Sequence, residues 1–286
     1  MSSTHPEYRS ITGFNNNLEN PHWGATNTRL IRETPFAYED GISSPSGADR
    51  PNPRDISNTV LDQQERTFNR KNASDFLWAW GQYVDHDLGL TQNHSPTEPL
   101  NIPIPAGDPY FDPGATGTQE FEFNRSIYDT TTGTHTTNPR QQINTQSSFI
   151  DSSNVYGADE RRASLLRTND GTGKLKTGPE GYLMYNTFLL HNDPAPTPNF
   201  FLAGDVRANE QPLLAALHAL WVLEHNRIAS TLDDGNTSGE EIYQRARRMV
   251  TALNQHITYN EFLPVLLGDE ALTPYLGYNP DVNPGI

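Results

Sequence analysis

Hydrophobic side chains recur at helical spacing in three parts of the chain, and long stretches without a period separate these parts. The strongest pattern covers residues 210–232, where apolar positions lie three and four apart. Asn209 is the predicted N-cap of this helix, and Pro212 is compatible with its first turn. The predicted apolar stripe consists of Leu213, Leu214, Leu217, Leu220, Trp221 and Ile228.

A second helix is predicted to begin at Ser238. Glu241 follows three residues later, and this spacing forms a capping box. The helix should end before Pro264, because proline cannot donate a backbone hydrogen bond inside a helix. The predicted stripe consists of Ile242, Ala246, Met249, Val250, Leu253 and Ile257.

A third helix is predicted within 74–91, with Ser74 as its N-cap and with Phe76, Trp80 and Val84 as its buried stripe.

The rest of the chain has the composition of loops. Residues 1–70 and 92–140 are rich in turn-forming residues, and the whole chain contains 22 prolines and 21 glycines. The segment SSFIDSSNVY (147–156) is too short and mixed to assign, and a short helix is expected over 158–168. The sequence therefore predicts a mainly α fold with long irregular loops and little β structure.

Charge and composition exclude several classes of partner. The chain of 286 residues has 20 basic and 35 acidic side chains, a formal net charge of -15. This balance argues against binding to nucleic acid or to an anionic membrane surface, because both require basic patches. No apolar run approaches the roughly 20 residues that span a bilayer. The start, MSSTHPEYRS, is not a Sec-type signal peptide, and the absence of cysteine excludes disulfides and thiolate ligands.

The segment WGQYVDHDLGLT carries the candidate chemistry. Gln82, Asp85 and His86 fall on one face of the predicted helix, because residues three and four apart are neighbours. Asp87 points about 100° away from His86 and can serve a different site. An amide, a carboxylate and an imidazole together form a plausible acid–base site, and the second carboxylate suggests a metal behind it.

Five blocks extend this evidence over nearly the whole chain. WGQYVDHDL resembles the distal-histidine helix of the animal-type haem peroxidases, in the peroxidase–cyclooxygenase superfamily. FIDSSNVYGADE resembles the calcium loop of that family, and FLAGDVRANEQP with LHALWVLEHNRIA resembles the segment with the distal arginine and a haem-linked glutamate. YRSITGFNNNLENPHWGATNT and ITYNEFLPVLLG also resemble family blocks, and all five occur in family order. The resemblance is closest to the bacterial branch.

This resemblance assigns roles around a haem b cofactor. His86 matches the residue that moves a proton between the oxygens of hydrogen peroxide, a task suited to an imidazole. Arg207 matches the distal arginine, whose fixed charge stabilises a developing anion, and Gln82 matches the residue that orients water and halide. Asp85 and Glu210 match the two carboxylates that form ester links to haem in mammalian members.

A calcium site is also implied by the resemblance. Its predicted ligands are Asp87, Ser147, Phe149, Asp151 and Ser153. Carboxylates, hydroxyls and a backbone carbonyl make an all-oxygen shell of the kind that Ca²⁺ prefers. Because Asp87 follows His86 directly, such an ion would fix the distal helix.

The resemblance indicates the distal, N-terminal part of a single peroxidase domain over 1–286. Its expected parts are an N-terminal wrap (1–70), the distal helix (74–91), the calcium loop (147–157) and the distal Arg/Glu segment with two long helices (207–265). The proximal histidine that holds the haem iron in relatives would follow Ile286, so the activity of this chain alone is expected to be impaired. The missing C-terminal half is then a possible partner.

The predicted activity is reduction of hydrogen peroxide with oxidation of halides, thiocyanate or small organic donors. Gln211 replaces a haem-linked methionine of one mammalian relative, so we expect weak chloride oxidation and a preference for bromide, iodide, thiocyanate or phenols. Two alternatives stay open: a fatty-acid dioxygenase of the same superfamily, and a non-catalytic, calcium-stabilised module for binding or adhesion. The chain is expected to be cytoplasmic or secreted through a C-terminal signal.

Other polar residues of the helical segments are expected to be structural. His218 and His225 lie seven apart on one helix face, but their LH…EHN pattern occurs in the family without a ligand role. Asn226 and His256 receive the same interpretation.

Overall fold

Helices supply most of the regular structure in the computed structural model, which describes residues 7–268 and 270–286. In chain order the elements are β1 (Thr28–Arg29), α1 (Pro53–Leu61), α2 (Phe76–Leu88), β2 (Ile102–Pro103), β3 (Glu120–Phe121), β4 (Ile143–Asn144), α3 (Ser153–Tyr156), α4 (Glu160–Leu166), the 3-10 helix η1 (Pro179–Gly181), α5 (Pro212–Leu232), α6 (Gly239–Ile257), the π-helix η2 (Thr258–Phe262) and α7 (Leu263–Leu267). Each strand has only two residues, in two-stranded sheets that pair β1 with β4 and β2 with β3. The predicted mainly α fold with long loops is confirmed.

The chain divides into two compact units. The first contains the described residues of Met1–Thr28, Lys71–Leu90 and Asn144–Ile286, and the second contains Arg29–Arg70 and Thr91–Ile143. All candidate site residues named above belong to the first unit.

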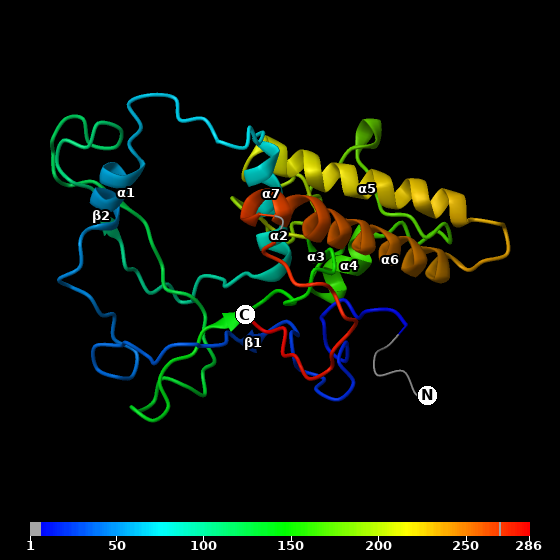
Figure 1. Ribbon diagram of the computed structural model, residues 1–286, viewed down its shortest axis with the longest axis horizontal. Helices are drawn as coiled ribbons and strands as arrows, with labels where there is room; N and C mark the ends of the chain where they lie inside the picture. Colours follow the sequence, from blue (N-terminus) through cyan, green and yellow to red (C-terminus); the bar gives the residue numbers. More distant parts are fainter. Residues whose placement is uncertain (1–6, 269) are drawn as a thin grey trace. The chain divides into compact units, whose positions relative to one another are not determined.

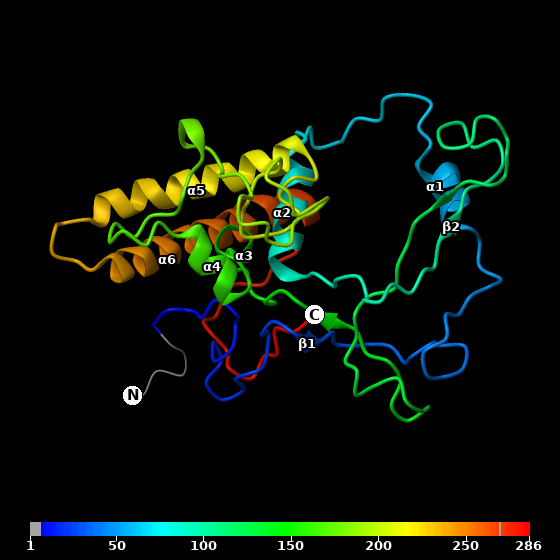
Figure 2. The ribbon, with the colours of Figure 1, turned by 180° about the vertical axis from the view of Figure 1, so that it is seen from behind.

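The core of the first unit is built on the long helices α5 and α6. They lie side by side in both views (Figures 1 and 2), and α2 packs against α5. Burial of their apolar faces supplies the main driving force for this packing. Buried core residues on these three helices include Ala79, Tyr83, Leu214, Leu217, Trp221, Ile228, Ile242, Ala246 and Val250.

The start of α5 differs from the prediction by a few residues. The N-cap is Gln211, whose side chain accepts a hydrogen bond from the backbone N–H of Leu213 at 2.7 Å. The predicted cap, Asn209, instead exchanges hydrogen bonds with the backbone of Phe201. Leu220 was expected in the buried stripe but is 52% exposed. Tertiary contacts of Asn209 therefore override its local capping preference.

The start of α6 agrees with the prediction. Ser238 Oγ accepts the backbone N–H of Glu241 at 3.2 Å, so the predicted N-cap is confirmed, whereas the Glu241 carboxylate accepts from Tyr8 and Arg245 and does not complete the predicted capping box. Met249 and Leu253 belong to the predicted stripe but are exposed. Helix α6 ends before Pro264, as predicted, but η2 and α7 follow it directly and continue the helical path. Pro264 is tolerated there because it lies in the first turn of α7, where no backbone donor is required.

Helix α2 is shorter than predicted and buries a different face. Its N-cap is Asp75 rather than Ser74, and Asp75 makes no side-chain capping hydrogen bond. Phe76 is 59% exposed, while Trp80 and Val84 are only half-buried. The buried residues of α2 are Ala79, Tyr83, His86 and Asp87. The packed stripe therefore ends on the two polar residues of the candidate site.

Two short helices follow the SSFIDSSNVY segment. They are α3 and α4, and α4 confirms the helix expected over 158–168. Gly204 packs directly on α3, because a Cβ at this position would lie 2.4 Å from the carbonyl oxygen of Ser153 and 2.6 Å from the backbone nitrogen of Gly157. This close approach joins the FLAGDVR segment to the predicted calcium loop.

The second unit contains a helix that the sequence analysis missed. Residues 1–70 were expected to be loop, but 53–61 form α1, and residues 1–6 lie outside the described part of the chain. The Asn52 side chain caps α1 by accepting the N–H of Arg54, and Pro53 follows at the start of the helix. An asparagine followed by a proline is typical of a helix start, so the sequence contained a local signal for α1. Within this unit β2 pairs antiparallel with β3.

Candidate active site

His86 lies in the last turn of α2 and is buried, with only 5% of its surface exposed. Burial, followed by the charge of Arg207, lowers the pKa of His86 to about 4, so the imidazole is neutral at pH 7. Its Nδ1 atom is buried without a hydrogen-bond partner and lies 3.9 Å from Asp205 Oδ1. The nearby carboxylate favours a proton on Nδ1, which leaves Nε2 as the acceptor, 3.8 Å from Glu210 Oε2.

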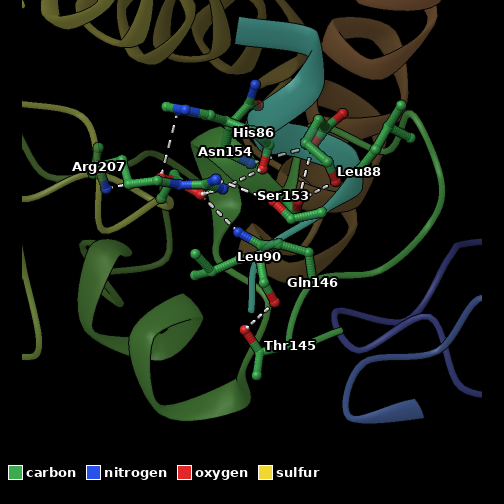
Figure 3. A network of polar contacts seen from close by, with 12 residues as sticks. His86, Leu88, Leu90, Thr145, Gln146, Ser153, Asn154 and Arg207 are labelled. Carbon is green, nitrogen blue, oxygen red and sulfur yellow. Dashed lines mark hydrogen bonds and ion pairs between the residues drawn. The ribbon is translucent and has the colours of Figure 1, made fainter. Parts of the chain in front are cut away.

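Arg207 is held against the helix turn that carries His86. Its Nη2 donates to the His86 carbonyl at 3.1 Å, and its Nη1 donates to the Gly89 carbonyl at 3.0 Å. Nε and Nη2 also donate to the two carboxylate oxygens of Asp205, at 2.9 and 2.7 Å. Figure 3 shows His86 and Arg207, which come from separate segments, in one network of polar contacts. The guanidinium therefore fixes the backbone beneath the imidazole.

Asp205 is a central residue of this site that the sequence analysis missed. Its side chain is fully buried, and besides Arg207 it accepts a hydrogen bond from Gln146 Nε2 at 2.7 Å. Burial alone would raise the pKa of Asp205, but the hydrogen bonds and charge of Arg207 lower it below its ordinary value. In the sequence, Asp205 is marked only by its position two residues before Arg207, and this position does not reveal that its side chain is buried.

Gln82 links α2 to the segment before α5 on the more exposed side of the site. Its Nε2 donates to Glu210 Oε2 at 2.7 Å, and its Oε1 accepts from Gln211 Nε2 at 3.2 Å. The side chain of Glu210 is 41% exposed, and partial burial raises its pKa. Asp85 lies on the exposed side of α2. The structure thus brings Gln82, His86 and Glu210 together and leaves Asp85 outside their hydrogen-bond network.

The predicted calcium ligand Asp87 is buried on the other side of α2. Its Oδ1 accepts from Ser153 Oγ at 2.8 Å and from the backbone N–H of Asn154 at 3.2 Å. Its Oδ2 accepts the N–H of Ser152 at 2.9 Å. Burial, and then the nearby charge of Asp151, raises the pKa of Asp87 to about 8. Two carboxylates thus share a buried site.

The other predicted ligands lie around Asp151. This carboxylate accepts from Ser147 Oγ at 2.7 Å and from the N–H of Ser153 at 3.0 Å, and the Asp151 N–H donates to the Phe149 carbonyl at 2.9 Å. Burial raises the pKa of Asp151. Within the described residues there is no group of three or more His, Asp or Glu side chains suited to a metal. The predicted set contains only two such side chains, with hydroxyl and carbonyl oxygens as its other members.

The buried histidines of α5 have structural partners. His218 Nδ1 lies 2.9 Å from the Asn154 carbonyl, and His225 lies between the Tyr156 hydroxyl and the Gly173 carbonyl, each at 2.9 Å. Asn226 exchanges two hydrogen bonds with the backbone of Leu175, and His256 is exposed and contacts Asn260. These contacts agree with a structural role for His218, His225 and Asn226, while the interpretation of all four residues stays a prediction.

None of the helices within residues 7–268 and 270–286 combines the length and apolar character needed to cross a bilayer.

Comparison with known proteins gives a consistent picture. The sequence model of the animal haem peroxidase family matches residues 8–286. Thyroid peroxidase from Canis lupus familiaris is 36% identical, over 98% of this chain and 35% of its own length, and lactoperoxidase from Mesocricetus auratus is 37% identical, over 98% of this chain and 45% of its own length. Peroxidase A from Dictyostelium discoideum has a similar structure, with a TM-score of 0.80 and 28% identity over 97% of this chain and 56% of that chain.

The fold is shared more widely. A fatty acid alpha-dioxygenase from Arabidopsis thaliana matches with a TM-score of 0.72 at 22% identity, over 91% of this chain and 37% of that chain, which shows likeness of fold alone. The chain spans roughly a third to a half of the length of the curated relatives it matches. The expected bacterial branch stays a prediction. The matched length and the identity to these relatives establish that the chain belongs to the animal haem peroxidase family.

Proposed function

We propose that this chain provides the peroxide-binding face of a haem peroxidase that reduces hydrogen peroxide and oxidises small donors. One observation carries the proposal: a neutral, buried His86 has its Nε2 beside Glu210, and Arg207 anchors the backbone of the same turn. A base that is unprotonated at pH 7 and held rigidly is what proton transfer from peroxide requires.

The residues around His86 fit a haem on this face. Nδ1 has no hydrogen-bond partner and lies close to the Asp205 carboxylate, so the proton of the neutral imidazole is favoured there and Nε2 keeps the lone pair that accepts a proton. Gln82 and the partly exposed Glu210 lie on the Nε2 side of the imidazole. Glu210 is the carboxylate best placed to be attached to the cofactor. Asp85 lies on an exposed surface, so its predicted ester link rests on the resemblance alone.

Each residue then has a separate task in peroxide reduction. The haem, when bound, supplies the redox chemistry that accepts electrons from donors. His86 accepts a proton from one oxygen of hydrogen peroxide and returns it to the other oxygen; with two electrons drawn from the donor and two further protons, both oxygens are released as water. Gln82 orients the peroxide or a water through its amide, while Asp205 Oδ1, 3.9 Å from Nδ1 of the imidazole, favours its transient positive charge.

Calcium binding is the second part of the proposal. Asp87 and Asp151 are buried close together, and burial raises the pKa of both carboxyls although Arg247 and Arg9 act against it at Asp151, so the pair has less positive charge nearby than would offset its burial. A divalent cation held by Asp87, Ser147, the Phe149 carbonyl, Asp151 and Ser153 would supply that charge. Because Asp87 and His86 are adjacent in α2, the ion would stabilise the active-site helix.

The experiment compares haem binding and donor oxidation in His86→Ala and His256→Ala. The purified chain is supplied with haem, its Soret band is recorded, and peroxide-dependent oxidation of bromide and a phenol is measured. We expect a Soret band, donor oxidation that is impaired in this chain alone but falls by a further factor of about 10² or more in His86→Ala, and no change in His256→Ala, where the histidine is exposed.

Other outcomes would overturn the proposal in distinct ways. A chain that binds no haem but is stabilised by calcium would be the non-catalytic module. Oxygenation of linoleate in place of bromide oxidation would identify a fatty-acid dioxygenase. Equal activity of the two histidine variants would refute the role of His86.

A further inference from the structure

A cavity of about 300 Å³ lies beside α6, apart from the residues of the candidate active site. Its walls come from α6, from residues 7–16 and from the segment after α7. The lining contains Arg9, Arg247 and Arg248 against a single carboxylate, Glu7. In a chain with a formal net charge of -15, this is a local concentration of positive charge.

The three arginines are held mainly by backbone and aromatic contacts. The buried Arg247 donates Nη1 to the Arg9 carbonyl at 2.7 Å and Nη2 to the Ser10 carbonyl at 3.0 Å. The Arg9 guanidinium lies 4.8 Å from the ring centre of Phe149. Arg248 lies over Tyr8 at 5.4 Å. These contacts orient the guanidinium groups without neutralising them.

Nearby carboxylates cancel only part of this charge: the buried Asp151 interacts electrostatically with Arg247 and Arg9, but it does not line the cavity. Glu7 approaches Arg248 only to 3.8 Å, with side chains that are 74% and 56% exposed, so solvent screens the pair. On α6, Glu241 is bound by Arg245 at 2.6 Å and by Tyr8 at 2.8 Å, and Glu240 is bound by Arg167.

Asn16 provides an independent sign of a missing ligand. It lines the cavity and is only 4% exposed. Its Oδ1 accepts the backbone N–H of Ser10 at 2.9 Å, but its Nδ2 is buried without a hydrogen-bond partner. Buried donors in folded proteins almost always have an acceptor, because an unpaired one is costly. An acceptor oxygen of a ligand would satisfy it.

We propose that this cavity binds the phosphate group of a small organic phosphate ester. Guanidinium forks match the geometry of phosphate oxygens, and Asn16 Nδ2 supplies a further donor. The volume is at the small end of the range for ligand pockets, enough for a phosphate with a compact organic body. The rings of Tyr8 and Tyr278 in the lining offer contacts to that body.

The test is calorimetric titration of the full chain with inorganic phosphate and with phenyl phosphate. We expect saturable binding of phenyl phosphate with a dissociation constant below about 1 mM, and weaker binding of inorganic phosphate. If neither phenyl phosphate nor inorganic phosphate binds saturably, the proposed site is refuted. Equal affinity for both probes would overturn the assignment to an ester.

Two pairs of variants locate the site. Asn16→Asp keeps the acceptor for the Ser10 N–H but replaces the orphan donor by a negative oxygen, so affinity should fall at least tenfold. Asn199→Asp makes the same change at an exposed residue outside the cavity and should bind normally.

The exposed Arg248→Gln is expected to fold normally and to weaken binding, whereas Arg227→Gln on α5 has the same charge change and should not. Equal affinities within either pair would place the phosphate elsewhere and refute the proposal.

Discussion

Replacing Asp205 by asparagine tests whether its carboxylate is what holds the arginine of the active site. The side chain is fully buried and receives the Nε and Nη2 atoms of Arg207 at 2.9 and 2.7 Å, together with Gln146 Nε2 at 2.7 Å. Asparagine preserves the shape and one acceptor oxygen but removes the charge. Arg207, whose side chain is only 11% exposed, would then lose its salt-bridge partner.

The expected loss follows from this burial. Removing one partner of a buried ion pair costs about 3–5 kcal/mol, because the remaining charge is left uncompensated. Arg207 keeps two backbone carbonyls and some exposure, so we expect the lower end, about 3 kcal/mol of unfolding free energy. Glu224→Gln is the matched control, because its partner Arg227 is 64% exposed, and it should cost about 0.5 kcal/mol.

The assay is urea unfolding of the full chain, followed by circular dichroism, for the wild type, Asp205→Asn, Arg207→Gln and the double variant. The cycle should give a coupling energy of at least about 1.5 kcal/mol between the two residues, since they share one buried network. If Asp205→Asn and Glu224→Gln lose the same free energy and the coupling is near zero, the buried pair does not hold the site together.

Three further perturbations test other parts of the molecule. Calcium at about one hundred times its dissociation constant should stabilise the fold by about 2.7 kcal/mol, and chelator should remove this gain; in Asp151→Asn the melting temperature should be indifferent to both. Burial lowers the pKa of His225 to about 4 from 6.5, so the unfolded chain binds a proton that the folded chain does not, and stability should rise with pH between these values. His86 and His218 contribute in the same direction, so His225→Gln should reduce that slope by one part while the exposed His256→Gln leaves it unchanged, and equal slopes in the two variants would contradict the assignment. Gly204→Ala should cost about 1–3 kcal/mol in thermal or urea unfolding, because the new Cβ meets the backbone of α3, whereas Gly114→Ala has only a distant neighbour and should be neutral.

The helices of the first unit were predictable because their signals are local. Ser238 caps α6 as expected, and the apolar period of α5 and α6 matches their buried faces at Leu214, Ile228 and Val250. The errors occurred where tertiary contacts decide. Asn209 is a good capping residue by type, but the backbone of Phe201 engages it, so the cap moves to Gln211.

The candidate site was predictable only in part, for a related reason. A motif read from sequence brings Gln82 and His86 to one face of a helix, and the structure adds Glu210 to them. The motif alone cannot show that the carboxylate of Asp205, two positions before Arg207, is buried against the guanidinium. Burial depends on segments distant in sequence, here Gln146 and the turn of α2, and therefore becomes visible only in three dimensions.

One residue of α3 explains how distant segments reach a common geometry. Asn154 donates its backbone N–H to Asp87 and its side-chain Nδ2 to the Tyr83 carbonyl, both on α2. Its own carbonyl lies 2.9 Å from His218 Nδ1 on α5. Gly204 packs on the same turn without space for a Cβ. A shift of α3 would therefore alter Asp87 and the segment leading to Arg207 together, so ordering of the predicted calcium loop and alignment of His86 with Arg207 should respond to the same perturbations.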